Sequence, residues 1–455
     1  MTVNSGEELA AQFAEWRAYL GSRRAVHGAD VDELEDHLRD TVAELVRVGL
    51  RPDEAFLVAV KRMGNQDELA REFAQVHSER LWKQLVLTGA AQAPEPVAAR
   101  SDVAVALGFA VIAALGVKMP ELFGLGFDDG GDFYLRNISF FALVPLAAYL
   151  ATRRRVTVRV AGVLVTAFAV GVAGANAYPM AHSSQSIVLT ALHLPLALWF
   201  VVGVAYGGGE WRSHRRWMDF IRFTGEWAIY FVLIALGGGV LTGMTVGVFR
   251  AIGLDATPFV QSWLLPCGAA GAVVIAAWLV EAKQSVIENM APVLTKVFTP
   301  LFATAMLAFL VAVLLTGSII DVDREVLIVF DLLLVVVLGL LLYAISARDP
   351  ASEPALFDRL QLALPVSAVL IDLLVLLAVA SRITEWGATP NKAAALGENV
   401  VLLANLTWTA FLLTRFLRRR RPFRHLEQWQ TRYLAVYAVW VWCVVLVFPP
   451  AFRFA

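Results

Sequence analysis

The feature that most constrains this chain is a series of long apolar stretches that fills the sequence from residue 103 to its end. A helix needs about 20 mostly apolar residues to cross the ~30 Å hydrocarbon layer of a membrane. We therefore predict an all-α chain with a polytopic membrane domain of about 11 spans, or 10 if one of the two short terminal stretches does not cross. The stretches are Val103–Met119, Leu135–Thr152, Val156–Tyr178, Ile187–Tyr206, Trp227–Phe249, Phe259–Val280, Phe298–Thr316, Val326–Ile345, Leu362–Ala380, Leu396–Leu413 and Tyr433–Phe448.

Composition agrees with a membrane protein and excludes other classes. Apolar residues make up 58% of the chain and charged residues 17%, against about 45–50% and about 25% in soluble domains. The formal net charge is −1, which does not fit a globally basic nucleic-acid binder. The two cysteines, Cys267 and Cys443, both lie in apolar stretches. They provide no disulfide framework and no metal-ligand cluster, so we expect no metal and no cofactor.

The charged residues are concentrated before the first apolar stretch. Residues 1–102 hold 12 of the 38 basic and 18 of the 39 acidic side chains. The segment around Met1 is too acidic for a secretory signal peptide, which predicts a cytoplasmic location for this charged region. We divide the chain into a helical domain at 1–88, a linker rich in Pro and Ala at 89–102, and a transmembrane domain at 103–455.

Residues 7–87 have the pattern of four short amphipathic helices. The second is the clearest, because Asp30 and Glu33 have the spacing of a capping box and would start it. Its apolar stripe, at three- and four-residue spacing, consists of Leu34, Leu38, Val42 and Leu45. Helices this short must pack on one another, so we predict a cytoplasmic four-helix bundle.

Three segments of this domain resemble the bacterial permease prefix domain, in the subgroup designated domain 1. They are ValAspGluLeuGluAspHisLeu at 31–38, GlyLeuArgProAspGluAlaPhe at 49–56 and LysArgMetGlyAsn at 61–65. In that family the domain is regarded as a cytoplasmic regulatory or adaptor module without catalysis. The resemblance implies a cytoplasmic protein partner for the N-terminal bundle.

A second resemblance covers about residues 357–417. Its core is ArgIleThrGluTrpGlyAlaThrProAsnLys at 382–392, which joins two long apolar stretches. This region resembles the bacterial membrane family called domain of unknown function 4153, which commonly has Arg where this chain has Lys392. The resemblance implies a membrane architecture and names no substrate.

Basic residues between the spans predict the orientation, because cytoplasmic segments are enriched in Lys and Arg. With the N-terminus inside and 11 spans, inner segments carry 19 basic residues and outer segments carry 7. We therefore expect the C-terminus outside, and the two resemblances imply a bacterial cytoplasmic membrane protein. The run Arg418–Arg421 fits contact with anionic lipid better than with nucleic acid. The outer residues are Lys118, Arg136, Arg250, Arg324, Arg382, Lys392 and Arg453.

Four polar residues inside the apolar stretches are candidate functional residues. An ionisable side chain at the bilayer centre costs about 2.5–3.5 kcal/mol on insertion scales. Asp372 lies deepest and has no Lys or Arg nearby in sequence, so we expect it to be neutral and hydrogen-bonded; Asp331 is the second acid. His193 and Asn405 are the expected partners. Either these residues form a proton or cation site shared between spans, or they fix helix packing.

A charged cluster is expected at the outer mouth, around the turn after the ninth stretch. It consists of Arg382, Glu385, Lys392 and Glu398. Such a cluster would gate or bind a solute. The alternative is an ordinary interfacial group, with Trp386 as the membrane-belt anchor.

Gly239, Gly243 and Gly247 recur every four residues in the fifth stretch. Small residues at this spacing allow another helix to approach closely. We expect this face to pack against a helix, either of the same chain or of a second copy in an oligomer.

No recognisable catalytic motif accompanies these residues, so we do not expect an enzyme. The buried acids favour a transport- or channel-like membrane domain controlled by the cytoplasmic helical domain. The alternative is an envelope-sensing signalling protein that relays to a cytoplasmic partner through the N-terminal bundle.

Overall fold

The computed structural model describes residues 13, 28–47, 50, 55–56, 59, 97–127, 130–181, 184–282, 290–316, 324–348, 350 and 352–454. All regular structure in these ranges is helical, which confirms the predicted all-α class. The chain forms two compact units, Met1–Glu95 and Pro96–Ala455. The division between them lies inside the predicted linker.

The first unit is described around one helix, α2 (Gly28–Arg47). The side chains of Leu38, Val42 and Leu45 are buried, which confirms the predicted apolar stripe for these three positions. The helix begins two residues before Asp30, so the prediction that Asp30 starts it was wrong, an error of the size that helix-end fraying produces. Of the other three predicted helices, the described residues are Phe13 in the first and Ala55, Phe56 and Ala59 in the third, and all four are helical and buried. The rest of these three helices lies outside the described residues.

The second unit is a bundle of long helices, and each of the 11 apolar stretches overlaps one of them. The first helix begins inside the predicted linker, directly after Pro96, where Ala-rich sequence favours a helix. The helices are α5 (Val97–Lys118), α6 (Gly131–Arg153), α7 (Val158–Asn176), α8 (Gln185–Tyr206), α9 (His214–Ala251), α11 (Leu265–Ala282), α12 (Met290–Thr316), α13 (Arg324–Ala347), α14 (Leu356–Trp386), α15 (Pro390–Leu417) and α16 (Arg424–Leu446). Short elements η1 (Met119–Phe123), α10 (Thr257–Phe259), η2 (Val260–Leu264) and α17 (Phe448–Ala451) join or end them.

Nine helical segments within the described ranges are long and apolar enough to cross a membrane. The chain is thus a multi-pass α-helical membrane protein whose apolar surfaces contact the lipid bilayer. Two of the 11 predicted stretches fall outside this count. In α12, whose helix is 27 residues long, the part counted among the described residues is Thr295–Ala308, and α16 begins with a polar segment that contains Arg424 and Glu427.

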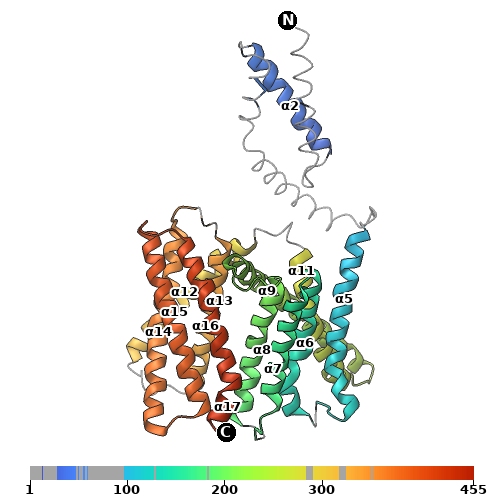
Figure 1. Cartoon of the computed structure of the whole chain (residues 1–455), viewed down its shortest axis with the longest axis vertical. Helices are drawn as coiled ribbons and strands as arrows, with labels where there is room; N and C mark the ends of the chain where they lie inside the picture. Colours follow the sequence, from blue (N-terminus) through green and yellow to red (C-terminus); the bar gives the residue numbers. More distant parts are fainter. Residues whose placement is uncertain are drawn as a thin grey trace. The chain divides into compact units, whose positions relative to one another are not determined.

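The helices run side by side between two ends of the bundle (Figure 1). At one end Arg153 pairs with Asp102 at 2.5 Å, and Arg154 pairs with Glu281 at 2.7 Å. We call this the arginine-rich end, because it also holds Arg418–Arg421. The other we call the C-terminal end, because the C-terminus lies there (Figure 1).

Two apolar cores divide the bundle into two helix groups. The first group packs α5, α6, α7, α8 and α11 around one core, with the beginning of α9. The second group packs α12, α13, α14, α15 and the beginning of α16 around the other. In Figure 1 the first group is mostly cyan to green and the second is orange to red.

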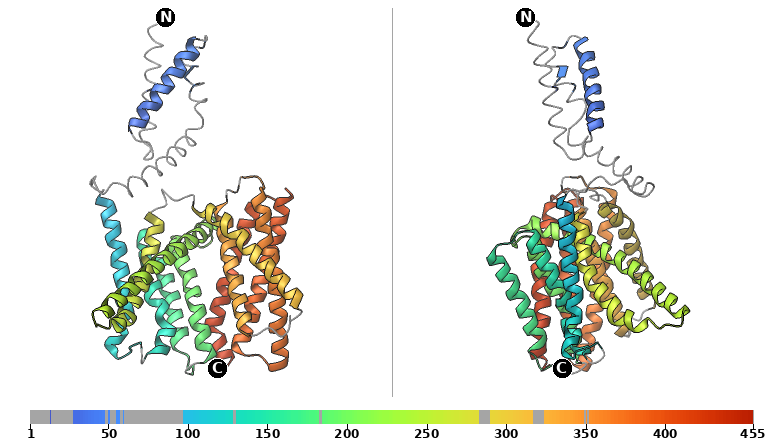
Figure 2. Two further views of the ribbon diagram at one scale, coloured as in Figure 1. Left: turned by 180° about the vertical axis from the view of Figure 1, so that it is seen from behind. Right: turned by 90° about the vertical axis from the view of Figure 1, so that its right-hand side faces the viewer.

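Helix α9 differs from the rest of the bundle. Its 38 residues give a length of about 57 Å at about 1.5 Å per residue, and it runs obliquely across the bundle (Figure 2). A Cβ atom at Gly239, Gly243 or Gly247 would meet no atom of another described element within 4 Å. The glycine face therefore does not pack inside the described part of this chain. The exposed apolar side chains on the same half of the helix are Val232, Leu233, Leu236, Val240, Leu241, Met244 and Val248.

Candidate functional site

Three carboxyl groups from consecutive helices of the second group form what we call the acidic cluster. They are Asp331 on α13, Asp372 on α14 and Glu398 on α15. The side chains of Asp331 and Glu398 lie close enough to Asp372 to interact with it electrostatically. Asp331 and Glu398 also lie in electrostatic range of each other.

Asp372 is the innermost member of the acidic cluster. It is 0% exposed, and neither carboxyl oxygen has a hydrogen-bond partner among the described residues. It lies 14 residues before Trp386, the last residue of α14, which is about 21 Å along the helix. An ionised carboxylate without a partner is too costly at this position. The group therefore fits the predicted neutral state and offers two oxygen atoms to a proton or a small cation.

Asp331 is held by a neighbouring amide. Its Oδ1 accepts a hydrogen bond of 3.0 Å from Nδ2 of Asn399, and the same amide group donates to the backbone oxygen of Ala395 at 2.8 Å. Asn399 is fully buried, and its Oδ1 has no partner among the described residues. Three buried oxygens of the site thus have no donor in the part of the chain that the structure describes.

A network of polar side chains lies beside the acidic cluster, between α15 and α16. Nδ2 of Asn405 donates to the hydroxyl of Tyr437 at 2.8 Å and to Oε1 of Gln430 at 3.1 Å. Gln430 in turn donates to Oγ1 of Thr409 at 2.5 Å, and the indole nitrogen of Trp429 donates to Oδ1 of Asn405 at 2.7 Å. Tyr437 lies in electrostatic range of Asp372 and so connects the network to the cluster.

The predicted hydrogen bond from Asp372 to His193 or Asn405 was wrong. His193 belongs to α8, and its Nδ1 lies 2.9 Å from the backbone oxygen of Leu189, one turn earlier in the same helix. Asn405 gives its amide hydrogens to Gln430 and Tyr437 instead. Both side chains are satisfied by nearer partners, which leaves Asp372 without either of them.

Of the four residues predicted at the outer mouth, Arg382, Glu385 and Lys392 lie at or near the turn between α14 and α15, and Glu398 does not. Lys392 Nζ donates to the backbone oxygens of Arg382 and Gly387, each at 3.1 Å, and so closes the turn between α14 and α15. Gly387 adopts a positive φ of 74° there, a conformation that glycine accepts without strain. Glu385 accepts from the adjacent Trp386 at 3.2 Å. Glu398 lies further along α15 and joins the acidic cluster.

Sequence reasoning did not assign two residues of this site, Asn399 and Glu398, to the site. Asn399 was not selected, and Glu398 was assigned to the outer mouth. A helical signal was available, because Glu398 and Asn405 are seven residues apart and therefore lie on the same face of α15. The contact between α13, α14 and α15 is tertiary and has no comparable signal in one sequence.

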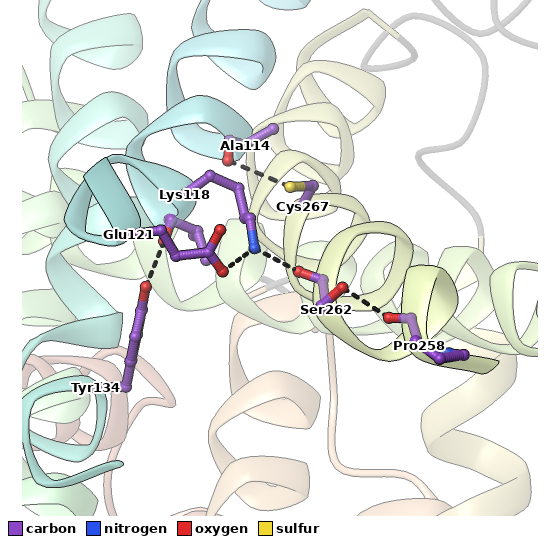
Figure 3. A network of polar contacts seen from close by, with 8 residues as sticks. Ala114, Lys118, Glu121, Tyr134, Pro258, Ser262 and Cys267 are labelled. Carbon is purple, nitrogen blue, oxygen red and sulfur yellow. Dashed lines mark hydrogen bonds and ion pairs between the residues drawn. The ribbon is translucent and has the colours of Figure 1, made fainter. Parts of the chain in front are cut away.

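The first helix group contains a buried cation, shown in Figure 3. Lys118 Nζ contacts the carboxylate of Glu121 and donates to the backbone oxygen of Ser262 at 2.9 Å. It also lies 4.5 Å from the ring centroid of Trp263. Ser262 and Trp263 belong to the π-helical turn η2, a geometry in which carbonyl groups lose their usual helical donors. Lys118 is thus fully partnered and ties α5 to η2.

Within the described ranges, no three His, Cys, Asp or Glu side chains form a group able to hold a metal ion. No family model matches the chain, and neither does any curated protein or solved structure.

Proposed function

We propose that the membrane unit moves a proton or a small cation through the second helix group, with Asp372 as the exchanging group. The observation that carries the proposal is the fully buried carboxyl of Asp372, whose two oxygens have no partner among the described residues. Buried polar groups are normally hydrogen-bonded, and exceptions call for an explanation. An ionisable residue inside the membrane is by default a functional candidate.

The polar groups of the second helix group lie at different distances from the C-terminal end of the bundle. This arrangement supports a path for a proton or a small cation. Asp331 is seven residues from the beginning of α13 and Glu398 is eight from the beginning of α15, or about 10–12 Å from the C-terminal end. Asp372 lies deeper, at about 21 Å along α14. Asn405, which is bonded to Tyr437 at 2.8 Å, lies at a similar depth, 15 residues from the beginning of α15, or about 22 Å.

The proposed orientation follows from the arginine-rich end. Cytoplasmic segments are enriched in Lys and Arg, so we place this end in the cytoplasm of a bacterial cell and the C-terminus outside. That arrangement requires an odd number of crossings and agrees with 11 spans, α12 and α16 included. The acidic cluster would then open toward the exterior, the side from which the membrane potential drives cations inward.

The N-terminal unit is proposed to regulate the membrane unit, as the resemblance to the permease prefix domain implies. The observation that supports this role is its separation into a compact unit of its own. The same observation favours the second candidate function, envelope sensing with a relay to a cytoplasmic partner. In a purely signalling protein, Asp372 would fix the packing of α14 and would not exchange protons. Neither the transport function nor the signalling function that we propose is enzymatic.

Infrared spectroscopy of the full chain in liposomes tests the proposal. A protonated carboxyl gives a separate absorption band, and we expect this band to respond when the external pH is stepped across about 5 to 9, the range in which buried carboxyls titrate. Asp372→Asn should remove the responding band. Asp358→Asn is the matched control, because Asp358 is equally buried but is paired with Arg348 at 2.9 Å and should contribute no such band.

Either of two results would overturn the proposal. One is a band that stays unchanged over the whole pH range in the original protein. The other is a pH response that Asp372→Asn leaves intact. The first would mean that the carboxyl is sealed and structural, and the second would assign the exchange to another group.

A further inference from the structure

A groove runs along the first helix group at the arginine-rich end, between α7, α8 and α16. It encloses about 580 Å³, which is within the ~300–1,000 Å³ of small-molecule sites. Its wall is almost entirely apolar. The wall residues include Leu164, Val201, Leu434, Ala438, Val439 and Trp442.

The mouth of the groove is cationic. Arg212, in the segment between α8 and α9, and Arg432, on α16, both line it. Both side chains are exposed, and the structure gives neither an ion-pair partner in the described ranges. The nearby Glu210 pairs with Arg216 at 3.3 Å. No Asp or Glu is among the residues that line the groove.

His214 at the mouth is held in a defined orientation. Its Nδ1 lies 2.8 Å from Oγ1 of Thr431, and that oxygen also lies 3.0 Å from the backbone oxygen of Glu427. The hydroxyl has one hydrogen, which it donates to the backbone oxygen. Nδ1 of His214 is therefore the donor to Thr431. When the ring is protonated, its Nε2–H supplies a further donor at the mouth.

The apolar part of the groove has the length of one membrane leaflet. Arg432 and Trp442 are ten residues apart on α16, which is about 15 Å along the helix axis. Half of the ~30 Å hydrocarbon layer is also about 15 Å. A chain that enters beside Arg432 would thus reach the bilayer midplane near Trp442.

From these observations we propose that the groove binds one anionic phospholipid. Its acyl chain lies along Leu434, Ala438 and Trp442, and its phosphate is bound between Arg212 and Arg432. Arginine forms short, bidentate hydrogen bonds to phosphate oxygens, and basic pockets between membrane helices are typical headgroup sites. A zwitterionic lipid would bring an ammonium group to a mouth that has no carboxylate to receive it.

Two tryptophans support a headgroup at this level. Trp211 and Trp217 line the same mouth, and the indole nitrogen of Trp217 donates to the backbone oxygen of Trp211 at 2.7 Å. Tryptophan is enriched at the membrane–water interface, where its ring spans the boundary. The mouth therefore lies where a phosphate would lie in the bilayer, and the groove lies in the hydrocarbon layer.

Native mass spectrometry of the full chain in mild detergent tests the proposal, with phosphatidylglycerol and phosphatidylcholine of equal chain length as probes. We expect phosphatidylglycerol to be retained and phosphatidylcholine to be lost. Arg212→Gln combined with Arg432→Gln should weaken retention about 25-fold, since each cation near an anionic headgroup contributes roughly a factor of five. Arg215→Gln combined with Arg359→Gln removes the same charge from exposed positions outside the groove and should leave retention unchanged.

Two further measurements test whether the acyl chain and the apolar groove contribute to binding in addition to the headgroup and the mouth. Excess inorganic phosphate should not displace the lipid, because the acyl chain supplies part of the affinity. Ala438→Trp should fill the groove and abolish retention while the helical circular dichroism signal persists; if this variant fails to fold, the paired arginine variants decide alone. Equal retention of both lipids, equal loss in the control pair, or displacement by phosphate would each overturn the proposal.

Discussion

Two buried ionisable side chains, one in each helix group, have opposite surroundings. In the first group Lys118 is 6% exposed, and its ammonium contacts Glu121, the backbone oxygen of Ser262 and the ring of Trp263. In the second group Asp372 is 0% exposed, and its carboxyl has no partner among the described residues. Asp358 of the second group is paired with Arg348 at 2.9 Å, so the lack of a partner is particular to Asp372 and is not shared by the other buried acid of α14.

Neutral polar groups show a weaker contrast, because the buried hydroxyl of Thr190 in the first group also has no partner among the described residues. In the first group Asn137 and Asn176 exchange two hydrogen bonds of 2.9 and 2.8 Å, so each amide satisfies the other. In the second group Oδ1 of Asn399 and Nε2 of Gln361 are buried without a partner in the described chain. A buried polar atom left in this state costs about 1–3 kcal/mol.

The largest expected effect on stability comes from replacing Lys118, the buried cation of the first group. Lys118→Ala should lower the free energy of unfolding by about 3 kcal/mol, because it removes an ion pair, a hydrogen bond and the packing of a long side chain at once. Thermal unfolding of the purified protein in detergent, followed by fluorescence, measures the change. Lys118→Arg keeps the charge and should lose less. A Lys118→Ala protein as stable as the original would remove the contrast between the two groups.

Glycines give the next test, because some are covered and others are open. A Cβ atom at Gly397 would lie 1.9 Å from the ring of Trp440, whereas one at Gly243 would meet nothing within 4 Å. Gly397→Ala should therefore destabilise the protein by about 2 kcal/mol through overpacking between α15 and α16. Gly243→Ala should be neutral or slightly stabilising in the same thermal assay. Equal effects of the two substitutions would contradict the described packing.

Replacing the carboxyl group of Asp372 in the second group should change the stability in the opposite direction. Asp372→Leu replaces an unpartnered polar group by an apolar side chain of similar size, and we expect it to raise the free energy of unfolding by about 1 kcal/mol. Thermal unfolding at neutral pH measures the gain, with Asp358→Leu as the control that should destabilise by breaking the pair with Arg348. A strong loss of stability in Asp372→Leu would show that the carboxyl is satisfied after all.

The smallest effect concerns the open face of α9, for which we propose contact with a second copy of the chain. Gly243→Leu should reduce self-association without changing the stability of the monomer, because small residues allow close helix contact. Cross-linking or sedimentation in detergent measures the oligomeric state, and Val240→Ala on the same half of the helix is the control. A purely monomeric original protein would show that lipid alone covers this face.

Much of the fold could be predicted because spans are a local property of the chain. The length of each apolar stretch located the helices of the membrane unit, and depth within a stretch identified Asp372 and Asp331. Helix α9 was underestimated, since its polar beginning at His214 continues the same helix as the apolar stretch from Trp227. The N-terminal stripe of Leu38, Val42 and Leu45 followed from periodicity alone.

The partners of the polar residues could not be predicted, because they depend on contacts between distant helices. Lys118 receives its acceptor from Ser262, 144 residues later. Asp331 is bound by Asn399 across 68 residues. His193 was assigned to the site of Asp372, but its own helix supplies its partner. Polar character and depth are readable from a sequence, whereas the identity of a partner requires the tertiary structure.

Proton entry into liposomes tests the central claim most directly. The full chain is reconstituted with a pH-sensitive dye inside, the membrane potential is clamped with potassium and valinomycin, and the external solution is acidified. We predict faster proton entry than in protein-free liposomes, a loss of this difference in Asp372→Asn, and its retention in Asp358→Asn. Entry by the Asp372→Asn protein at the rate of the original would contradict the role assigned to Asp372.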